Sequence, residues 1–205
     1  MMQDLTQRIE ASVEQMKNEM IQQRRDLHRH PEPGWTEFRT AALVGKTLQQ
    51  LGYEVKAGKD AIAADSMMGV PSAAILQAAQ QRAIAEGADP DWVKKMTGGF
   101  TGIVAVMKFS KPGPVVGIRV DMDSNDVTET TEPAHRPNQE GFASQHPKAM
   151  HACGHDGHTT VGLAIAKILA TFKDELAGTI KLIFQPAEEG VRGAKAMVEN
   201  GDVDD

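Results

Sequence analysis

Apolar side chains recur at helical spacing near the start of the chain. Between residues 9 and 28 they lie three or four positions apart among charged residues, and two prolines follow, which predicts a helix that ends before them. A second helix is predicted over residues 36–51 and is terminated by Gly52. The short segment 53–57 is then predicted to be the first strand.

Residues 58–99 interrupt this pattern with a stretch rich in Met, Ala and Gln. Within it, the sequence PSAAILQAAQQRAIAEGA at residues 71–88 predicts one further helix. We expect the whole segment to be a helical insertion that packs on the surface of the domain.

Two β-branched runs follow, over residues 101–109 and 114–121. The SKPG sequence between them predicts that the two strands are neighbours in a hairpin. A polar stretch without clear periodicity then extends from Asp123 to about Met150. A loop of that length in a compact domain is more often functional than idle.

The remaining elements are a mostly apolar helix over residues 159–172, a strand over residues 179–185 and a last helix over residues 191–200. Helices therefore alternate with apolar strands along the chain. This alternation predicts an α/β fold in which a mixed sheet is covered by helices on both faces.

The composition narrows the class of protein. With 205 residues the chain is long enough for one sizeable domain. Its formal net charge of −6 and its interspersed charges leave no basic stripe for nucleic acid. No apolar run approaches the ~20 residues of a membrane span, and the polar N-terminus lacks the apolar segment of a signal peptide. We therefore expect a cytoplasmic protein without a nucleic-acid or membrane partner.

Chemistry concentrates in the sequence MHACGHDGHTT, which contains the only cysteine of the chain. One cysteine cannot form an internal disulfide, so Cys153 is a buried apolar residue, a nucleophile or a metal ligand. Cys153 and His155 flank Gly154, which permits a bend that lets both side chains face one way. Thiolate and imidazole together suit zinc and other late first-row metals. We expect Asp156 to cap the following helix, and the spacing does not decide whether His158 reaches the site.

A pair of adjacent carboxylates, Glu188 and Glu189, follows the last predicted strand. Adjacent side chains point in different directions, so one carboxylate can bind a metal while the other handles a proton. Two acids this close repel unless a cation lies between them, although a solvated acidic turn at a helix start is an alternative. Residues 121–123, 151–158 and 186–190 all lie where a strand ends or a helix begins, so we expect them to meet at one edge of the sheet.

Four motifs occur in a fixed order: RRDLHRHPEPGWTEFRT, GIRVDMDS, MHACGHDGHTT and LIFQPAEEGVRGA. Together they resemble the amidohydrolase branch of the aminoacylase and carboxypeptidase G type metallopeptidases along nearly the whole chain. The sequences GWTEFRTA and GGFTGIVA narrow the resemblance to members that act on aminobenzoyl-glutamate. The resemblance implies a zinc-peptidase-like catalytic domain with two divalent metal ions, zinc or manganese, at the sheet edge.

The resemblance also implies roles for individual residues. Cys153, His155 and Glu189 match metal ligands of the family. Glu188 matches the general base that takes a proton from the metal-activated water. Asp123 matches an acidic catalytic-site residue that orients a ligand from behind.

Four further positions carry weaker expectations. Asp121 stands where many relatives outside this branch have a histidine, which makes it a weak ligand candidate. His28 and His30 belong to the N-terminal motif and are expected to be structural. Arg136 is a candidate to bind a carboxylate of the substrate.

The implied reaction is metal-dependent hydrolysis of an amide bond in an N-acyl amino acid. The expected substrate is p-aminobenzoyl-glutamate, cleaved to p-aminobenzoate and glutamate. Relatives carry further metal ligands beyond the Glu-Glu motif and a smaller dimerisation and lid domain, which residues 1–205 lack. The sequence is therefore interpreted as the N-terminal part of the catalytic domain, inactive alone, which at full length forms a homodimer or pairs with a paralogous second subunit.

Two other functions stay open at this point. In the first, His151 or His155 activates Cys153 as the nucleophile of a cysteine hydrolase, which leaves the two glutamates without a task. In the second, the chain is a non-catalytic fragment that folds with a partner chain supplying the missing ligands. A plainer interpretation of the cluster also exists, in which Cys153 is buried and the histidines cap or line a loop.

Overall fold

The structure of the protein, a computed structural model, describes residues 2–201 and 203. A four-stranded sheet lies at its centre in the order β1-β2-β4-β3. β1 pairs with β2 and β2 with β4 in antiparallel fashion, whereas β3 and β4 are parallel. The strands are β1 (Glu54–Ala57), β2 (Ile103–Lys108), β3 (Lys111–Asp121) and β4 (Ala177–Gln185). The predicted mixed sheet is confirmed.

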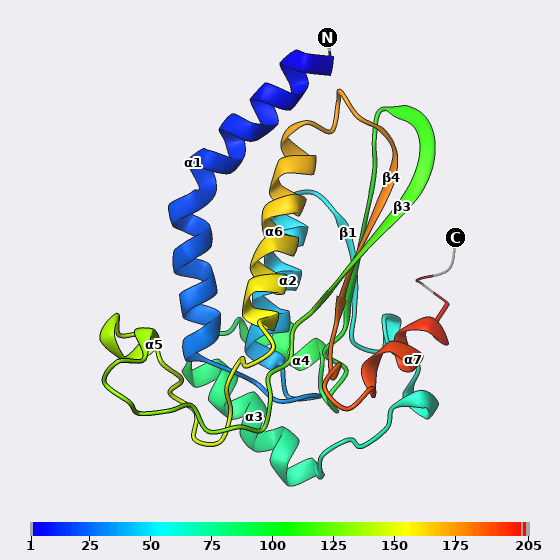
Figure 1. The fold of residues 1–205 in the computed structure, drawn as a ribbon. Coiled ribbons are helices and arrows are strands. Elements are labelled where there is room, and N and C mark those ends of the chain that lie inside the picture. The colour runs from blue at the N-terminus through cyan, green and yellow to red at the C-terminus, as the bar shows by residue number, and fades with distance from the viewer. Residues whose placement is uncertain (1, 202, 204–205) are drawn as a thin grey trace.

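Three long helices lie on one side of the sheet (Figure 1). They are α1 (Met2–Arg29), α2 (Phe38–Gln50) and α6 (His155–Thr171). On β4, every second residue enters the main core, as Ile180, Leu182 and Phe184 do. α2 and α6 pack on this face, and α1 packs along the outer side of α6. The period of two along β4 therefore fixes the face that the helices cover.

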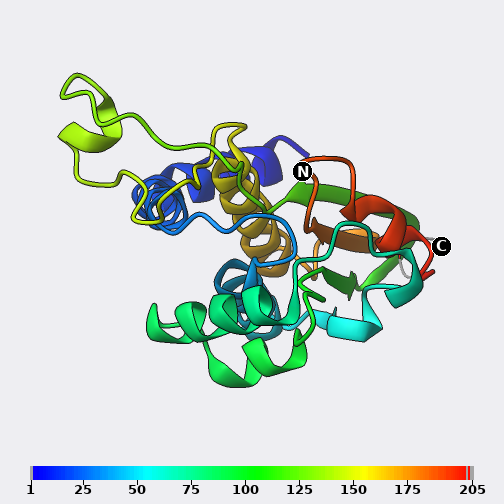
Figure 2. The same cartoon turned by 90° about the horizontal axis from the view of Figure 1, so that it is seen from below.

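The opposite face is covered only at one end in the part of the chain that the structure describes. α7 (Gly193–Val198) and two 3₁₀ turns, Gly58–Asp60 and Ala64–Ser66, lie there, with α7 on the side of the sheet away from α6 (Figure 2). Trp35 and Met197 are buried in a second apolar cluster on this side. Most of β3 stays exposed. Helices thus lie on both faces as predicted, and the second face is covered in part.

β2 and β3 are not the hairpin neighbours that the SKPG sequence predicts, because β4 lies between them. The two strands still run in opposite directions. Their short link passes the start of β4, where the backbone N–H of Phe109 donates to the carbonyl of Gly178 at 2.9 Å. A local turn signal reports the change of direction. It carries no information about a strand from much later in the chain that enters the gap.

The segment of residues 58–99 does more than pack on the surface, contrary to the prediction. It contains α3 (Ala73–Ala85) and α4 (Pro90–Lys95), and both pack against α2. Trp92 and Met96 are buried in the main core, and a Cβ at Gly45 would lie 2.3 Å from the Trp92 ring. The alanine-rich composition hides this role, because alanine is common both in cores and on surfaces.

Met96→Ala is expected to lower the free energy of unfolding by about 2–5 kcal/mol, because it leaves a cavity in the core. Met96 is 0% exposed, whereas Met68 in the same segment is 47% exposed. Met68→Ala is therefore the matched control, with an expected change within about 0.5 kcal/mol. Urea titration followed by circular dichroism measures both. Equal, small losses for the two variants would show that the segment is dispensable for the core.

Candidate metal centre

The parallel pairing of β3 and β4 brings two acidic segments to one edge of the sheet. Asp121, at the end of β3, is in register with Gln185, at the end of β4. The pairing continues one residue further, where the N–H of Met122 donates to the carbonyl of Gln185 at 3.1 Å. Residues 121–123 and 186–193 therefore leave the sheet side by side. The N-terminus of α6 points to the same edge, so the three predicted segments meet there (Figure 1).

The segment after β4 is held in an unusual backbone conformation. Ala187 and Val191 have positive φ angles of 48° and 59°, which non-glycine residues adopt only at a cost. Two buried carboxylates compensate by binding backbone N–H groups: Glu37 accepts from Ala187 at 2.8 Å, and Asp123 accepts from Glu189 at 3.0 Å. These bonds fix the direction in which the Glu188 and Glu189 side chains leave the chain.

His155 lies at the centre of the site and is oriented from behind. Its Nδ1 donates to the backbone carbonyl of Asp123 at 2.9 Å, which leaves Nε2 facing the acidic segment. Nε2 lies 3.7 Å from a carboxylate oxygen of Glu188 and 3.9 Å from one of Glu189. One ligand atom from each of these three side chains lies within 4.8 Å of the others. This is the arrangement of an imidazole and two carboxylates around a common point.

Cys153 joins the same site. A hydrogen bond from its thiol to Glu189, with the negative charges of Glu189 and Glu188, raises the pKa of Cys153 above its ordinary value. The side-chain amide of Asn125 lies 3.4 Å from the sulfur. The oxygen of that amide accepts from the backbone N–H groups of Ala152 and Cys153 at 3.1 and 3.2 Å. Asn125, which the sequence patterns did not single out, therefore holds the loop that presents the thiol.

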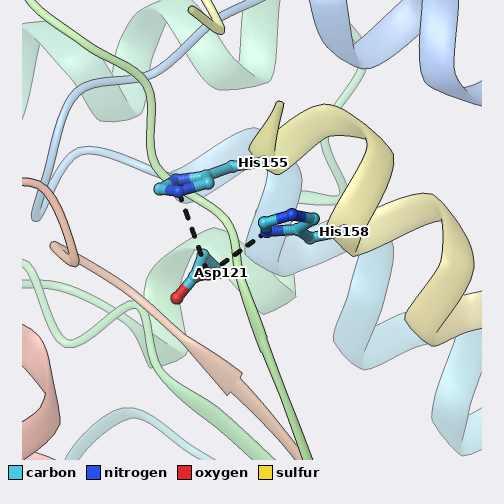
Figure 3. Close-up of side chains that lie close together, drawn as sticks. All are labelled: Asp121, His155 and His158. Atoms are coloured by element: carbon cyan, nitrogen blue, oxygen red, sulfur yellow. Dashed lines mark hydrogen bonds and ion pairs between the residues drawn. The ribbon is translucent and has the colours of Figure 1, made fainter. Parts of the chain in front are cut away.

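A second group of possible ligands shares His155. Asp121 lies 3.8 Å from Nε2 of His155 and 3.2 Å from Nδ1 of His158, with the two rings on either side of its carboxylate (Figure 3). The His158 side chain is 51% exposed, whereas that of His155 is 5% exposed. Asp121 also forms an ion pair with Arg119 at 2.7 Å. His158 thus reaches the edge of the site, while Asp121 is already occupied by a cation of the protein.

The electrostatics of the site favour a cation. Burial opposes protonation of His155, yet its hydrogen bond to Asp123 and the charges of Asp123 and Asp121 raise its pKa to about 9. One buried oxygen each of Asp123 and Glu189 has no hydrogen-bond partner within the described residues. A thiol, an imidazole and carboxylates are also the ligand types that zinc binds. The residues present therefore fit a divalent metal ion.

Glu37 is a buried acid that sequence patterns did not single out. Burial and the neighbouring carboxylate of Asp123 raise the pKa of Glu37 to about 8. Its second oxygen accepts from the hydroxyl of Thr101 at 2.6 Å. It lies in the GWTEFRT motif, so its presence was noted only as part of the resemblance. Nothing in the local sequence indicates that this glutamate reaches the segment after β4.

His28 has the structural role expected from its motif. Its two ring nitrogens lie 2.8 Å from Asp156 and 3.0 Å from Glu129, and all three residues are buried. This contact ties α1 to α6 and to the long polar loop. Asp156 is not the helix cap that was predicted, because α6 begins at His155 and the cap position is Gly154 with a φ of 83°. The left-handed glycine starts the helix earlier than the apolar pattern indicates.

Two other expected positions lie outside the cluster. His30 donates from Nδ1 to the carbonyl of Asp26 at 2.8 Å, within the last turn of α1, in agreement with a structural role. Arg136 pairs with Glu140 in the short helix α5 (Arg136–Gln139) and its first following residue. No contact between Arg136 and the cluster is among the interactions of the described residues, so its role with substrate stays a prediction.

The geometry gives the cysteine-nucleophile hypothesis little support. Neither ring nitrogen of His151 has a hydrogen-bond partner within the described residues, and burial lowers the pKa of His151 to about 4. The Nδ1 of His155 is bound to a backbone carbonyl. A raised pKa of Cys153 also works against the thiolate that a nucleophile requires.

Known proteins with related sequences define the class. The sequence model of Peptidase family M20/M25/M40 matches residues 117–205. Indole-3-acetyl-aspartic acid hydrolase from Enterobacter agglomerans is 54% identical over 94% of this chain and 44% of its own length. One of the named subunits of p-aminobenzoyl-glutamate hydrolase from Escherichia coli is 52% identical over 89% of this chain and 42% of its own length.

Solved structures agree with these sequence matches. An aminobenzoyl-glutamate utilization protein from Klebsiella pneumoniae has a TM-score of 0.78 and 42% identity, covering 96% of this chain and 43% of that one. A dinuclear metal-binding peptidase of the M20 family from Bacillus subtilis has a TM-score of 0.64 and 30% identity, covering 93% and 41%. The chain is thus a relative of peptidase family M20/M25/M40, which confirms the resemblance found in its motifs.

The chain spans less than half the length of the curated relatives named above, 44% and 42%. Among the described residues, no helix has the length and apolar character needed to cross a membrane.

Cys153→Ala is expected to weaken zinc binding. Loss of a group that only orients a ligand typically costs 10–100-fold in metal affinity, so loss of a ligand should cost at least about tenfold. Competition titration against a chromogenic chelator measures the affinity. Ser110→Ala is the control, because it removes a small polar group whose hydroxyl donates to the carbonyl of Asp174, away from the cluster. Unchanged zinc affinity of Cys153→Ala would exclude the thiol as a ligand.

Glu37→Gln is expected to flatten the dependence of stability on pH between about pH 5 and 8. The pKa of Glu37 is about 8 in the folded protein and ordinary, 4.5, in the unfolded chain. The folded state therefore binds more protons in this window, so the wild-type free energy of unfolding falls as pH rises through it. The neutral amide removes this contribution.

Urea titrations at several pH values measure the slope for each variant. Glu54→Gln, which neutralises an exposed carboxylate on β1, is the control and should retain the wild-type slope. The same slope for Glu37→Gln and wild type would contradict a raised pKa.

Proposed function

We propose that this chain provides the metal-binding part of an amidohydrolase that cleaves N-acyl amino acids. The observation that carries the proposal is the convergence of Cys153, His155 and the Glu188–Glu189 pair, with a buried oxygen of Glu189 left unpartnered among the described residues. Four groups of these types around one point suit a divalent ion better than any metal-free chemistry. The similarity to a dinuclear metal-binding peptidase supports the same assignment.

In this proposal, Cys153, His155 and Glu189 hold the metal. When bound there, a divalent ion lowers the pKa of water and polarises the amide carbonyl. Asp123 keeps the imidazole in the tautomer with the proton on Nδ1, so that Nε2 is free to bind. Its carboxylate also fixes the backbone of Glu189.

Glu188 is proposed as the general base. Its side chain is 37% exposed, whereas that of Glu189 is 25% exposed and has a buried oxygen. A carboxylate that is accessible beside the metal ligands can accept a proton from water and deliver it to the departing amine. Glu189, turned inward toward Cys153, is suited to ligation instead.

The proposed substrate is an amide of an acidic amino acid. Two of the relatives are named for the hydrolysis of indole-3-acetyl-aspartic acid and of p-aminobenzoyl-glutamate. These compounds differ in the acyl group and share an acidic amino acid as the amine half. We therefore propose p-aminobenzoyl-glutamate, cleaved to p-aminobenzoate and glutamate, as the substrate of the complete enzyme.

The complete enzyme is proposed to contain more than these residues. Two ions, zinc or manganese, would need about four protein ligands and a bridging water, and this site offers three ligands. We propose that residues 1–205 correspond to the N-terminal part of the catalytic domain, and that further ligands and a dimerisation domain lie elsewhere. Two relatives carry names that describe one subunit of a hydrolase, which supports a second, partner subunit. A homodimer is the other form of assembly to test.

Glu188→Gln in the complete enzyme is expected to reduce turnover of p-aminobenzoyl-glutamate by at least about 100-fold, because a general base is lost. Its metal content should stay at the wild-type level, because Glu188 is not a ligand in the proposal. Release of p-aminobenzoate, with metal analysis of the same samples, measures both. Glu189→Gln is the matched control and should lose metal together with activity.

Two outcomes would contradict this assignment. Turnover retained in Glu188→Gln would remove Glu188 as the base. Wild-type activity that persists in the presence of a strong chelator would favour the cysteine hydrolase instead.

A further inference from the structure

A cavity of about 580 Å³ lies between α3 and the segments on either side of the metal centre. Its lining includes Ile75 and Ala79 from α3, Gly34 from the N-terminal motif, and the two arginines Arg82 and Arg192. We call it the α3 pocket. Its walls combine aliphatic side chains with two guanidinium groups. Such a surface suits a ligand that has both methylene groups and a carboxylate.

The α3 pocket shares structural elements with the candidate metal centre. Arg192 lines the pocket, and its Nε donates to the backbone carbonyl of Glu189 at 3.2 Å. Asp126 also lines the pocket and follows Asn125, which contacts the sulfur of Cys153. A molecule in the pocket is therefore next to the segments that carry the proposed metal ligands.

The two arginines differ in how much of their hydrogen-bonding capacity is used. Arg192 donates to two backbone carbonyls, of Glu189 and of Gly69, and its Nη2 would lie 2.9 Å from a Cβ at Gly34. Glycine at position 34 thus leaves room for this guanidinium. The Nε of Arg82 is buried and has no hydrogen-bond partner within the described residues. An unpartnered guanidinium nitrogen at a cavity wall has a donor to offer to an anion.

The acidic groups near these arginines leave a net positive charge at the wall. Burial raises the pKa of Glu32, and the charge of Arg82 acts against that rise, so the two side chains are close. Both Glu32 oxygens accept backbone N–H groups, from Arg39 at 2.9 Å and Thr40 at 2.8 Å. Asp126 is the one carboxylate among the described residues that lines the pocket itself.

We propose that the α3 pocket binds the side-chain carboxylate of the acidic amino acid in the substrate, with Arg82 as the main specificity residue and Arg192 as its partner. Aliphatic α3 residues contact the methylene groups of the same side chain. This inference rests on the proposed function for the class of substrate. It assigns to the segment of residues 58–99 the selection of glutamate-type over neutral amino acids.

The test compares two probes of the same length, N-benzoyl-L-glutamate and N-benzoyl-L-glutamine, which differ only in the charge of the side chain. Isothermal titration calorimetry with the metal-free chain measures binding without any hydrolysis. Wild type should bind the glutamate probe more tightly. Arg82→Met should weaken binding of the glutamate probe by about tenfold or more and leave the glutamine probe almost unchanged. Arg82→Lys, which keeps the charge, should restore part of the difference.

Two further variants keep the result interpretable. Arg8→Met is the matched control, because Arg8 is exposed and pairs with Glu175, away from the pocket. Asp126→Asn should strengthen binding of the glutamate probe, because it removes the negative charge from the pocket wall. This variant tests the proposal independently if Arg82→Met proves unstable in urea titration.

Three results would overturn the proposal: no binding of the glutamate probe to wild type, equal binding of the two probes, or discrimination that Arg82→Met and Asp126→Asn leave unchanged. Failure of the proposed function has a different signature. In that case the metal-loaded complete enzyme cleaves neither probe, while the metal-free chain still discriminates between them.

Discussion

The concentration of carboxylates at one edge of the sheet is the constraint on which the site depends. Asp121, Asp123, Glu188 and Glu189 lie there because two parallel strands end side by side. Their mutual repulsion must be offset, and the structure does so with the imidazole of His155, whose pKa rises to about 9. A divalent ion would offset more charge than one proton does. The affinity of the site for metal is therefore a consequence of the strand pairing.

The surrounding residues hold this repulsive arrangement in place. Glu37 reaches the backbone after β4 from the N-terminal motif, and Asn125 holds the loop of Cys153 through its side-chain amide. Positive φ angles at Ala187 and Val191 show that the acidic segment is not in a conformation it would choose alone. The strain and the buried acids belong together, because the hydrogen bonds of the acids stabilise the strained backbone.

The sequence predicts most elements and the site, and it fails where distant segments decide. Helices such as α2 and strands such as β4 have clear periodicity, and the motif around Cys153 and His155 has recognisable ligand chemistry. The position of β4 between β2 and β3 is not a local property, and neither is the burial of Met96. The roles of Glu37 and Asn125 are equally invisible, since each acts on a segment far along the chain.

The place of β4 in the sheet links folding to function. Until β4 is in position, β2 and β3 have an open gap between them and no common hydrogen bonds in the final register. Closing that gap requires a contact between segments well separated in sequence, which is a slow kind of event. The same event carries Glu188 and Glu189 to Asp123. During synthesis on the ribosome, the chain accordingly acquires its acidic cluster only when its sheet is completed, so earlier intermediates have no assembled site at which to capture a metal ion.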